Sequence, residues 1–262
     1  MSWRISPSSG RLNFAPATNA WLAAVEAADG QLLENGVYNA MGAFGDYRIP
    51  LGGACCLMAG ALTLAGALVP MVGAGPTEVN FVSEDYDRTT GLVGDGSTKY
   101  LNSNRNNNAD GQDSRHIAVY ATARNTEDAP RAYIRATFAA AGGTQLISGA
   151  SAAKLSGRCS DSATATSASS LHATNGLFGA SRSTSAQYQI RGSSATEIIT
   201  QVSSTPGSGN YYVFAGNNLS ISATDLYSNA RLSYYSIGPA ADLEAMDTAI
   251  TTCMNALAAA GI

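Results

Sequence analysis

The chain has 262 residues, of which 45% are hydrophobic and only 13% are charged. Its 15 Lys and Arg residues face 19 Asp and Glu residues, which gives a formal net charge of -4. This composition excludes a disordered chain, since disorder needs low hydrophobicity and high net charge. It also argues against nucleic acid as a partner, because phosphate neutralisation needs a basic excess. The length suits one large domain, or one domain with an appendage.

The first part of the chain, residues 1–75, has a helical pattern. Thr18 or Asn19 is a suitable N-cap for a helix that carries its apolar residues on one face and ends at Gly30. A second short helical pattern follows over residues 33–44. We expect this segment to attach the protein to a larger assembly or to sister subunits.

Residues 51–75 contain no charged residue and are long enough to cross a bilayer. The run is mostly Gly and Ala, however, Pro70 interrupts it, and no basic cluster flanks it. We therefore predict a buried helix followed by an extended segment, with no membrane span. Its apolar character also suggests an interface between copies of the chain, and thus a homo-oligomer.

From residue 76 the hydrophobic period changes from helical to alternating, which is typical of strands. The alternating runs are separated by turns rich in Gly, Ser and Asn, as in an antiparallel sandwich. We expect a mainly β sandwich over 76–262, with strands near an edge and a mobile loop over 148–176. The predicted strands cover residues 78–82, 98–102, 116–123, 132–138, 144–148, 186–191, 196–202, 210–216 and 230–238.

Both faces of the strands at 210–216 and 230–238 are apolar, so each face needs a cover. One face is expected to meet the second sheet and the other a helix. Residues 242–257 supply that helix, because their apolar residues repeat at intervals of three and four behind Asp242, a suitable N-cap.

The cysteines and histidines predict neither a disulfide framework nor a metal site. Cys55, Cys56, Cys159 and Cys253 show no metal-ligand spacing, and two histidines lie apart from them. We expect buried free thiols, no metal and no cofactor.

Several stretches of the chain are similar to one known superfamily. The turn and strand VGDGSTKYL (93–101), the strand HIAVYATA (116–123) and the ending NARLSYYSIGPAADLEAMDTAI (229–250) carry the similarity, and the N-terminal TNAWLAAVEAADG (18–30) extends it. These residues resemble the concanavalin A-like lectin/glucanase superfamily, in the form found in phage structural proteins.

The resemblance implies a concanavalin A-like jelly roll in a phage virion, within a tail fibre or another appendage that binds a host surface glycan. Other virion proteins would be its partners, and a trimer would be its usual oligomeric state. The resemblance brings no catalytic residues with it. Because fold does not fix function, the receptor-binding role is an expectation by analogy.

The loop at residues 102–114, NSNRNNNADGQDS, has the most unusual composition in the chain. Amides and carboxylates at a rigid sheet edge suit the paired donors and acceptors of sugar hydroxyls, and a nearby tyrosine can supply an aromatic platform. The alternatives are a solvated hairpin loop and a calcium site using the two aspartates. The candidate glycan-binding residues are Tyr100, Asn104, Arg105, Asn106, Asn107, Asp110 and Asp113.

Two rivals to the receptor-binding role remain. A capsid decoration protein shares every sequence feature given above. A polysaccharide hydrolase on this fold needs two carboxylates about 5 Å apart, and the lectin-like glucanases place them as Glu-x-Asp-x-x-Glu on one strand. No such spacing occurs here: Glu197 stands alone in its strand. We therefore expect a protein that is not an enzyme.

Overall fold

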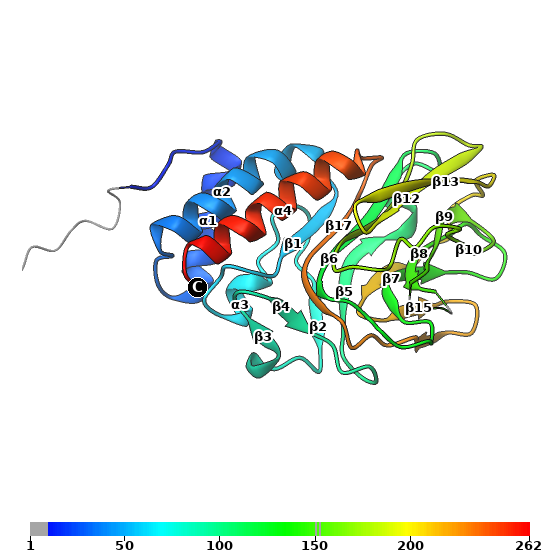
Figure 1. The fold of residues 1–262 in the computed structure, drawn as a ribbon, viewed down its shortest axis with the longest axis horizontal. Helices are drawn as coiled ribbons and strands as arrows, with labels where there is room; N and C mark the ends of the chain where they lie inside the picture. The colour runs from blue at the N-terminus through cyan, green and yellow to red at the C-terminus, as the bar shows by residue number, and fades with distance from the viewer. Residues whose placement is uncertain (1–9, 150, 152) are drawn as a thin grey trace, which may run out of the picture.

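A computed structural model describes residues 10–149, 151 and 153–262. Two β-sheets pack face to face, and helices cover the outer face of one of them (Figure 1). The predicted sandwich with N-terminal helices and a C-terminal helix is thus confirmed. The helices are α1 (Pro16–Asp29), α2 (Asn35–Arg48), α3 (Leu64–Ala67) and α4 (Leu243–Ala259), with 3-10 turns η1 (Ile49–Leu51), η2 (Ser83–Asp85) and η3 (Asn107–Ala109).

Sheet A is the sheet next to the helices. Its strands run, in spatial order, β13 (Ala195–Thr200), β12 (Gln187–Gly192), β11 (Gly176–Arg182), β6 (Arg115–Ala123), β17 (Arg231–Gly238), β4 (Gly91–Val93) and β3 (Tyr86–Asp87), and β1 (Ala54–Leu57) also pairs with β17. All these pairings are antiparallel.

Sheet B is the outer layer of the sandwich. Its strands run β10 (Ala165–Thr166), β9 (Leu155–Asp161), β8 (Gly143–Ser148), β7 (Ala132–Thr137), β14 (Asn210–Val213), β5 (Tyr100–Asn106) and β2 (Thr77–Val79). A hairpin of β15 (Gly216–Asn218) and β16 (Ala223–Asp225) joins the sheet beside β7. The strands expected near an edge within 148–176 are β10, which lies at the edge of the sheet, and β9, which lies next to it.

Apolar side chains form two buried layers. One lies between the sheets and includes Leu101, Val119 and Phe178; the other lies between sheet A and the helices and includes Met41 and Tyr234. The four cysteines are buried and free, as expected.

The C-terminal helix follows the prediction closely. The Asp242 carboxylate accepts hydrogen bonds from the N–H groups of Glu244 and Ala245, at 2.9 and 3.0 Å, and so caps α4. At the other end of the chain the expected cap was wrong. Helix α1 begins at Pro16, whose fixed φ suits the first helical turn, and Thr18 is buried inside the helix.

The prediction for residues 51–75 was wrong in its order of elements. The strand β1 comes first, and only the four residues of α3 are helical. Cys55 contacts the helix layer and Cys56 the layer between the sheets, because successive strand residues point to opposite faces. The apolar run is therefore explained by burial within one chain. Within the described residues, no helix is both long and apolar enough to cross a membrane.

The helices cover β17 but not β14. Tyr234 of β17 faces the helix layer, as expected, and a register shift between Leu232 and Tyr234 turns Leu232 to the inner face. In β14, Tyr212 points outward and is only half-buried, whereas Phe214, directly after the strand, adopts a left-handed φ of 68° and returns to the core. The expectation that a helix covers β14 was therefore wrong.

Candidate functional site

The predicted loop at 102–114 is held tightly by its own amides. Asn107 is fully buried: its Nδ2 donates to the carbonyls of Gly142 and Gly207, and its Oδ1 accepts from the Tyr211 hydroxyl and from Arg115. Its hydrogen-bonding capacity is used within the protein, so we leave Asn107 out of the site proposed below.

The other predicted loop residues fall into two groups. Arg105 and Asp110 form a two-pronged ion pair at 3.0 and 2.5 Å, and the Asn106 side chain binds the backbone of the loop and of Gly209. Asn104 is exposed, with its Nδ2 donating to the Gly75 carbonyl and the Thr77 hydroxyl, and Asp113 is half-buried. The described residues contain no cluster of three or more His, Cys, Asp or Glu side chains that is suited to a metal.

Tyr100 lies away from these residues, on the outer face of sheet B. Its ring stacks on that of Tyr212 from the neighbouring strand, with centroids 4.6 Å apart. The structure thus brings Arg105, Asn107 and Asp110 together but leaves Tyr100 in different surroundings. Glycan contact by the loop stays a prediction.

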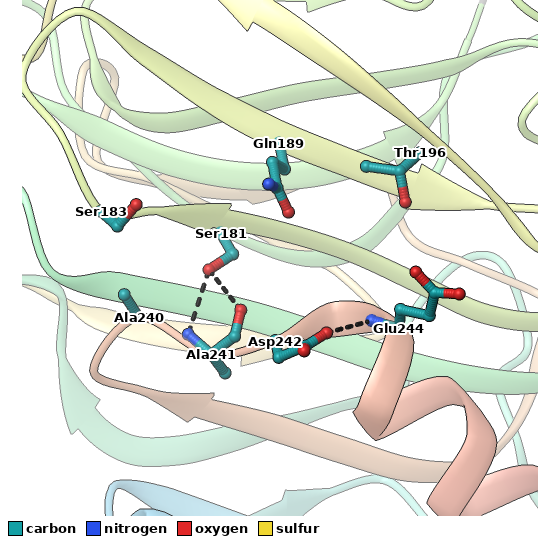
Figure 2. Close-up of a pocket in the computed structure, with 8 residues that line it drawn as sticks. All are labelled: Ser181, Ser183, Gln189, Thr196, Ala240, Ala241, Asp242 and Glu244. Atoms are coloured by element: carbon teal, nitrogen blue, oxygen red, sulfur yellow. Dashed lines mark hydrogen bonds between the residues drawn. The ribbon is translucent and has the colours of Figure 1, made fainter.

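A polar cleft of about 540 Å³ opens elsewhere, where the first turn of α4 meets β11, β12 and β13. Figure 2 shows Gln189 and Thr196 on the strands, across from Asp242 and Glu244 on the helical side. Ser181, Ser183, Ala240 and Ala241 complete the lining.

Two contacts hold the helical wall of the cleft in place. The Ser181 hydroxyl donates to the carbonyl of Ala241 and accepts from its N–H, at 2.8 and 3.1 Å. At Gly179, a Cβ atom would lie 2.9 Å from a methyl group of Leu243, so the missing side chain lets α4 begin close to β11. The parts of β11, β12 and β13 that lie beyond the first turn of α4 are not covered by this helix, and the cleft opens there.

An ion pair fixes α4 to the sheet beside the cleft. Arg191 of β12 contacts Asp247 of α4 at 2.9 and 3.0 Å, and both residues are buried. A third nitrogen of the same guanidinium donates to the Thr196 hydroxyl at 2.9 Å, which orients this cleft residue. These contacts therefore hold the helical wall and Thr196 in place without a ligand.

Several polar groups of the cleft have no protein partner within the described part of the chain. The side chains of Ser183, Gln189 and Glu244 belong to this group. They supply a hydroxyl, an amide and a carboxylate, which together can donate and accept hydrogen bonds. This set suits a ligand that carries several hydroxyl groups.

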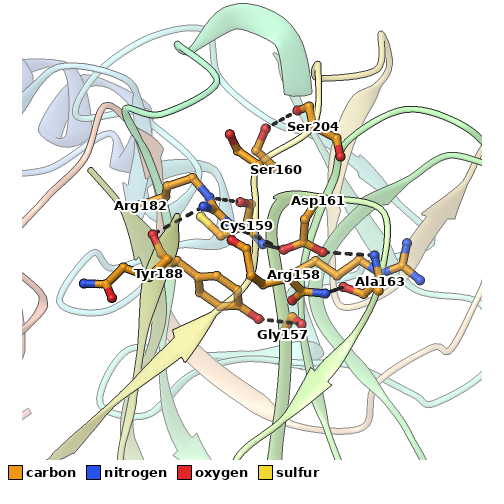
Figure 3. A network of polar contacts seen from close by, with 12 residues as sticks. Gly157, Arg158, Cys159, Ser160, Asp161, Ala163, Arg182, Tyr188 and Ser204 are labelled. Atoms are coloured by element: carbon orange, nitrogen blue, oxygen red, sulfur yellow. Dashed lines mark hydrogen bonds and ion pairs between the residues drawn. The ribbon is translucent and has the colours of Figure 1, made fainter. Parts of the chain in front are cut away.

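A second polar cluster, around Cys159, is structural (Figure 3). Arg182 reaches Asp161 at 3.5 Å and donates to the carbonyls of Cys159 and Gln201, and the Tyr188 hydroxyl donates to the carbonyl of Gly157. Burial raises the pKa of the Cys159 thiol to about 12, so the thiol stays protonated and poorly nucleophilic. Its neighbours hold the end of β9 in place.

The two histidines are buried as well. His172 lies against Phe178, and its Nε2 is 2.6 Å from the Tyr133 hydroxyl. Among the possible hydrolase carboxylates, Glu197 accepts from the N–H groups of Ala168 and Ser169. His172 and Glu197 therefore both have structural partners within the protein.

The comparison with known proteins concerns fold alone. No family model matches the chain, and no curated protein matches its sequence. The botulinum neurotoxin serotype D binding domain aligns with a TM-score of 0.51 and 8% identity, over 80% of this chain and 52% of that one.

Two sialidase structures align over smaller parts of the chain. The CBM40 of the Ruminococcus gnavus IT-sialidase, bound to alpha2,3 sialyllactose, aligns with a TM-score of 0.41 and 8% identity over 53% of this chain and 83% of that one. The leech intramolecular trans-sialidase aligns with a TM-score of 0.42 and 6% identity over 53% of this chain and 23% of that one.

Proposed function

We propose that this protein binds a glycan in the cleft between α4 and strands β11, β12 and β13. The observation that carries the proposal is the set of unpaired hydroxyl, amide and carboxylate groups on a concave, pre-arranged wall. Ligand sites are concave and hold a few fixed polar groups that orient the ligand. A sugar, with its many hydroxyls, matches this lining better than an apolar ligand does.

The charges of the cleft favour a neutral glycan. Glu244 can accept hydrogen bonds from two neighbouring hydroxyls of one ring, and charge-assisted bonds of this kind are stronger than neutral ones. Gln189 can donate and accept on the opposite wall. Asp242 and Glu244 would repel an acidic sugar, and no unpaired cation lies among the lining residues to offset that repulsion.

Glycan-array binding of the full chain tests the proposal. We predict that Glu244→Gln weakens binding to the best glycan by about tenfold, because a charge-assisted bond is lost. Gln189→Ala should weaken it by about two- to tenfold. Gln31→Ala, an exposed residue in the turn after α1, is the control and should bind as the wild type does. Unchanged binding by both cleft variants would rule out the cleft.

We further propose that the protein acts on a phage particle, as an appendage component that recognises the host surface. The resemblance of residues 93–101 and 229–250 to phage structural proteins supports this role. Labelling of intact particles with a specific antibody would test it: a few copies at the tail agree with receptor binding, whereas many copies on the head indicate capsid decoration.

The proposed activity is binding without hydrolysis. Of the two carboxylates in the cleft, Asp242 is engaged as the cap of α4, so no free pair faces the ligand. Incubation with the polysaccharide bound best should therefore release no reducing ends. Release that Glu244→Gln abolishes would show a hydrolase instead.

A further inference from the structure

Among the residues that the structure describes, the helices pack against sheet A and leave the outer face of sheet B uncovered (Figure 1). A cluster of tyrosines lies on that face. In β5, Leu101 and Ser103 point into the sandwich, so Tyr100 and Asn102 point outward. In β14, Tyr211 and Val213 point inward and Tyr212 outward. The outward residues are half-buried and remain partly open to solvent.

The rings of this cluster hold one another in place. Tyr100 and Tyr212 are stacked, with centroids 4.6 Å apart and planes 28° apart. Tyr227 packs edge-on against Tyr100, at 6.4 Å and 61°. We call these three residues the tyrosine platform. A ring fixed by its neighbours loses little conformational freedom when a ligand covers it.

Polar groups flank the platform along the strand register. Asn102 lies opposite Tyr212, and its Oδ1 accepts from the N–H of Asn104 and from Asn210. Its Nδ2 has no protein partner in the described parts of the chain. On the other side of Tyr212 lies Arg135, whose guanidinium is already paired with Asp225 and Gln145. The hydrogen-bond donor that stays available beside the rings is therefore the side-chain amide of Asn102.

We propose that the tyrosine platform is a second saccharide site, which takes the apolar C–H face of a neutral pyranose. The face of an aromatic ring is electron-rich and attracts the polarised C–H bonds of a sugar ring. The Asn102 amide would then donate to a ring hydroxyl. The fitting class is a β-linked glucose or galactose unit, whose axial hydrogens form such a face.

This inference rests on the proposed glycan binding and extends it to a second surface. The cleft lies on sheet A beside α4, and the platform lies on the far face of sheet B. One short oligosaccharide therefore cannot fill both sites. A long surface polysaccharide, or two neighbouring chains, can engage both and gain avidity.

Saturation-transfer NMR on the full chain, with methyl β-D-glucopyranoside and methyl β-D-galactopyranoside as probes, tests the platform. We expect saturation of the ring C–H protons of at least one probe, and upfield ring-current shifts of its bound signals. Tyr212→Ala should weaken binding by about tenfold, because it removes an aromatic anchor. Tyr212→Phe keeps the ring and should bind within about threefold of the wild type.

Controls separate the platform from the cleft and from misfolding. Glu244→Gln alters the cleft alone and should leave the platform signals unchanged, and near-ultraviolet circular dichroism must show that Tyr212→Ala is folded. Glycan-array binding with no ring-current shift in the wild type, or with wild-type binding by Tyr212→Ala, would overturn the platform and leave the cleft standing. No binding to any glycan would overturn both proposals.

Discussion

At the scale of single residues, a buried chain of hydrogen bonds joins helix α2 to sheet A. Arg48 donates to the Ser236 hydroxyl at 2.7 and 3.1 Å, and also to Tyr234 and to the carbonyl of Gly52. Ser236 in turn lies 2.6 Å from Nε2 of His116, whose Nδ1 faces the carbonyl of Pro239. Since a carbonyl only accepts, Nδ1 carries the proton and Nε2 accepts from Ser236.

His116 makes the stability of the protein depend on pH. Burial, and then the positive charge of Arg48, lower its pKa from the ordinary 6.5 to about 4. Below pH 6.5 His116 is protonated in the unfolded chain but stays neutral in the folded chain. The stability of the folded state therefore falls as the pH drops from about 6.5 to about 4. The shift corresponds to roughly 3 kcal/mol of unfolding free energy.

Urea unfolding at pH 7 and at pH 4 measures this loss. His116→Gln keeps a donor and an acceptor but cannot titrate, so the difference in unfolding free energy between wild type and variant should shrink or change sign at pH 4. Carboxylates titrate equally in both proteins and cancel in that difference. Parallel pH curves for the two proteins would contradict the assignment.

At the scale of elements, α4 is attached to sheet A by an apolar face and by the buried ion pair between Arg191 and Asp247. We predict that Asp247→Ala lowers the unfolding free energy by roughly 3–5 kcal/mol, because it leaves the Arg191 charge buried and unpaired. The double variant with Arg191→Met should lose less than the single variant, since no unpaired charge remains. Denaturant unfolding of the two variants checks this order, and the reverse order would contradict it.

The elements that the sequence predicted well are those with a clear period. Helix α4 combines a capping Asp242 with an apolar residue every three or four positions, and β12 alternates exposed and buried residues over its first four positions. The prediction for residues 51–75 was wrong because a run of Ala and Gly has no hydrophobic period that distinguishes a buried strand from a buried helix. Strand β11 was missed because its sequence, GLFGASR, contains two glycines and little alternation.

The candidate site was harder to predict than the fold. Gln189 and Thr196 are ordinary exposed strand residues, and Glu244 is an ordinary first-turn acid. They form a cleft only because α4 folds back over β11, a long-range contact that no local pattern shows. The conspicuous amides of the 102–114 loop, in contrast, largely serve the loop itself, since Asn106 and Asn107 bind backbone groups. Tyr100 was proposed as an aromatic platform for this loop, but its ring stacks on Tyr212 away from the loop, and glycan contact by Tyr100 stays a prediction.

At the scale of the whole molecule, the layers explain where ligands have access. The helices protect the outer face of sheet A except beyond the start of α4, where the cleft opens. In the described part of the chain no helix covers the outer face of sheet B, and this face carries the tyrosine platform. The two proposed sites thus occupy the uncovered surfaces of the two sheets.

The same layering predicts that the sandwich cannot fold without the N-terminal segment. Residues 1–75 supply β1, which pairs with β17, and the helices that cover Ala118, Leu177 and Tyr234. A fragment of residues 76–262 would expose that apolar face and the unpaired edge of β17, so we predict aggregation or a partly folded state. Near-ultraviolet circular dichroism and urea unfolding, with the full chain as the control, measure the outcome. A soluble fragment with native spectra and a sharp cooperative transition would show instead that 1–75 is an independent appendage, as its helical sequence pattern first suggested.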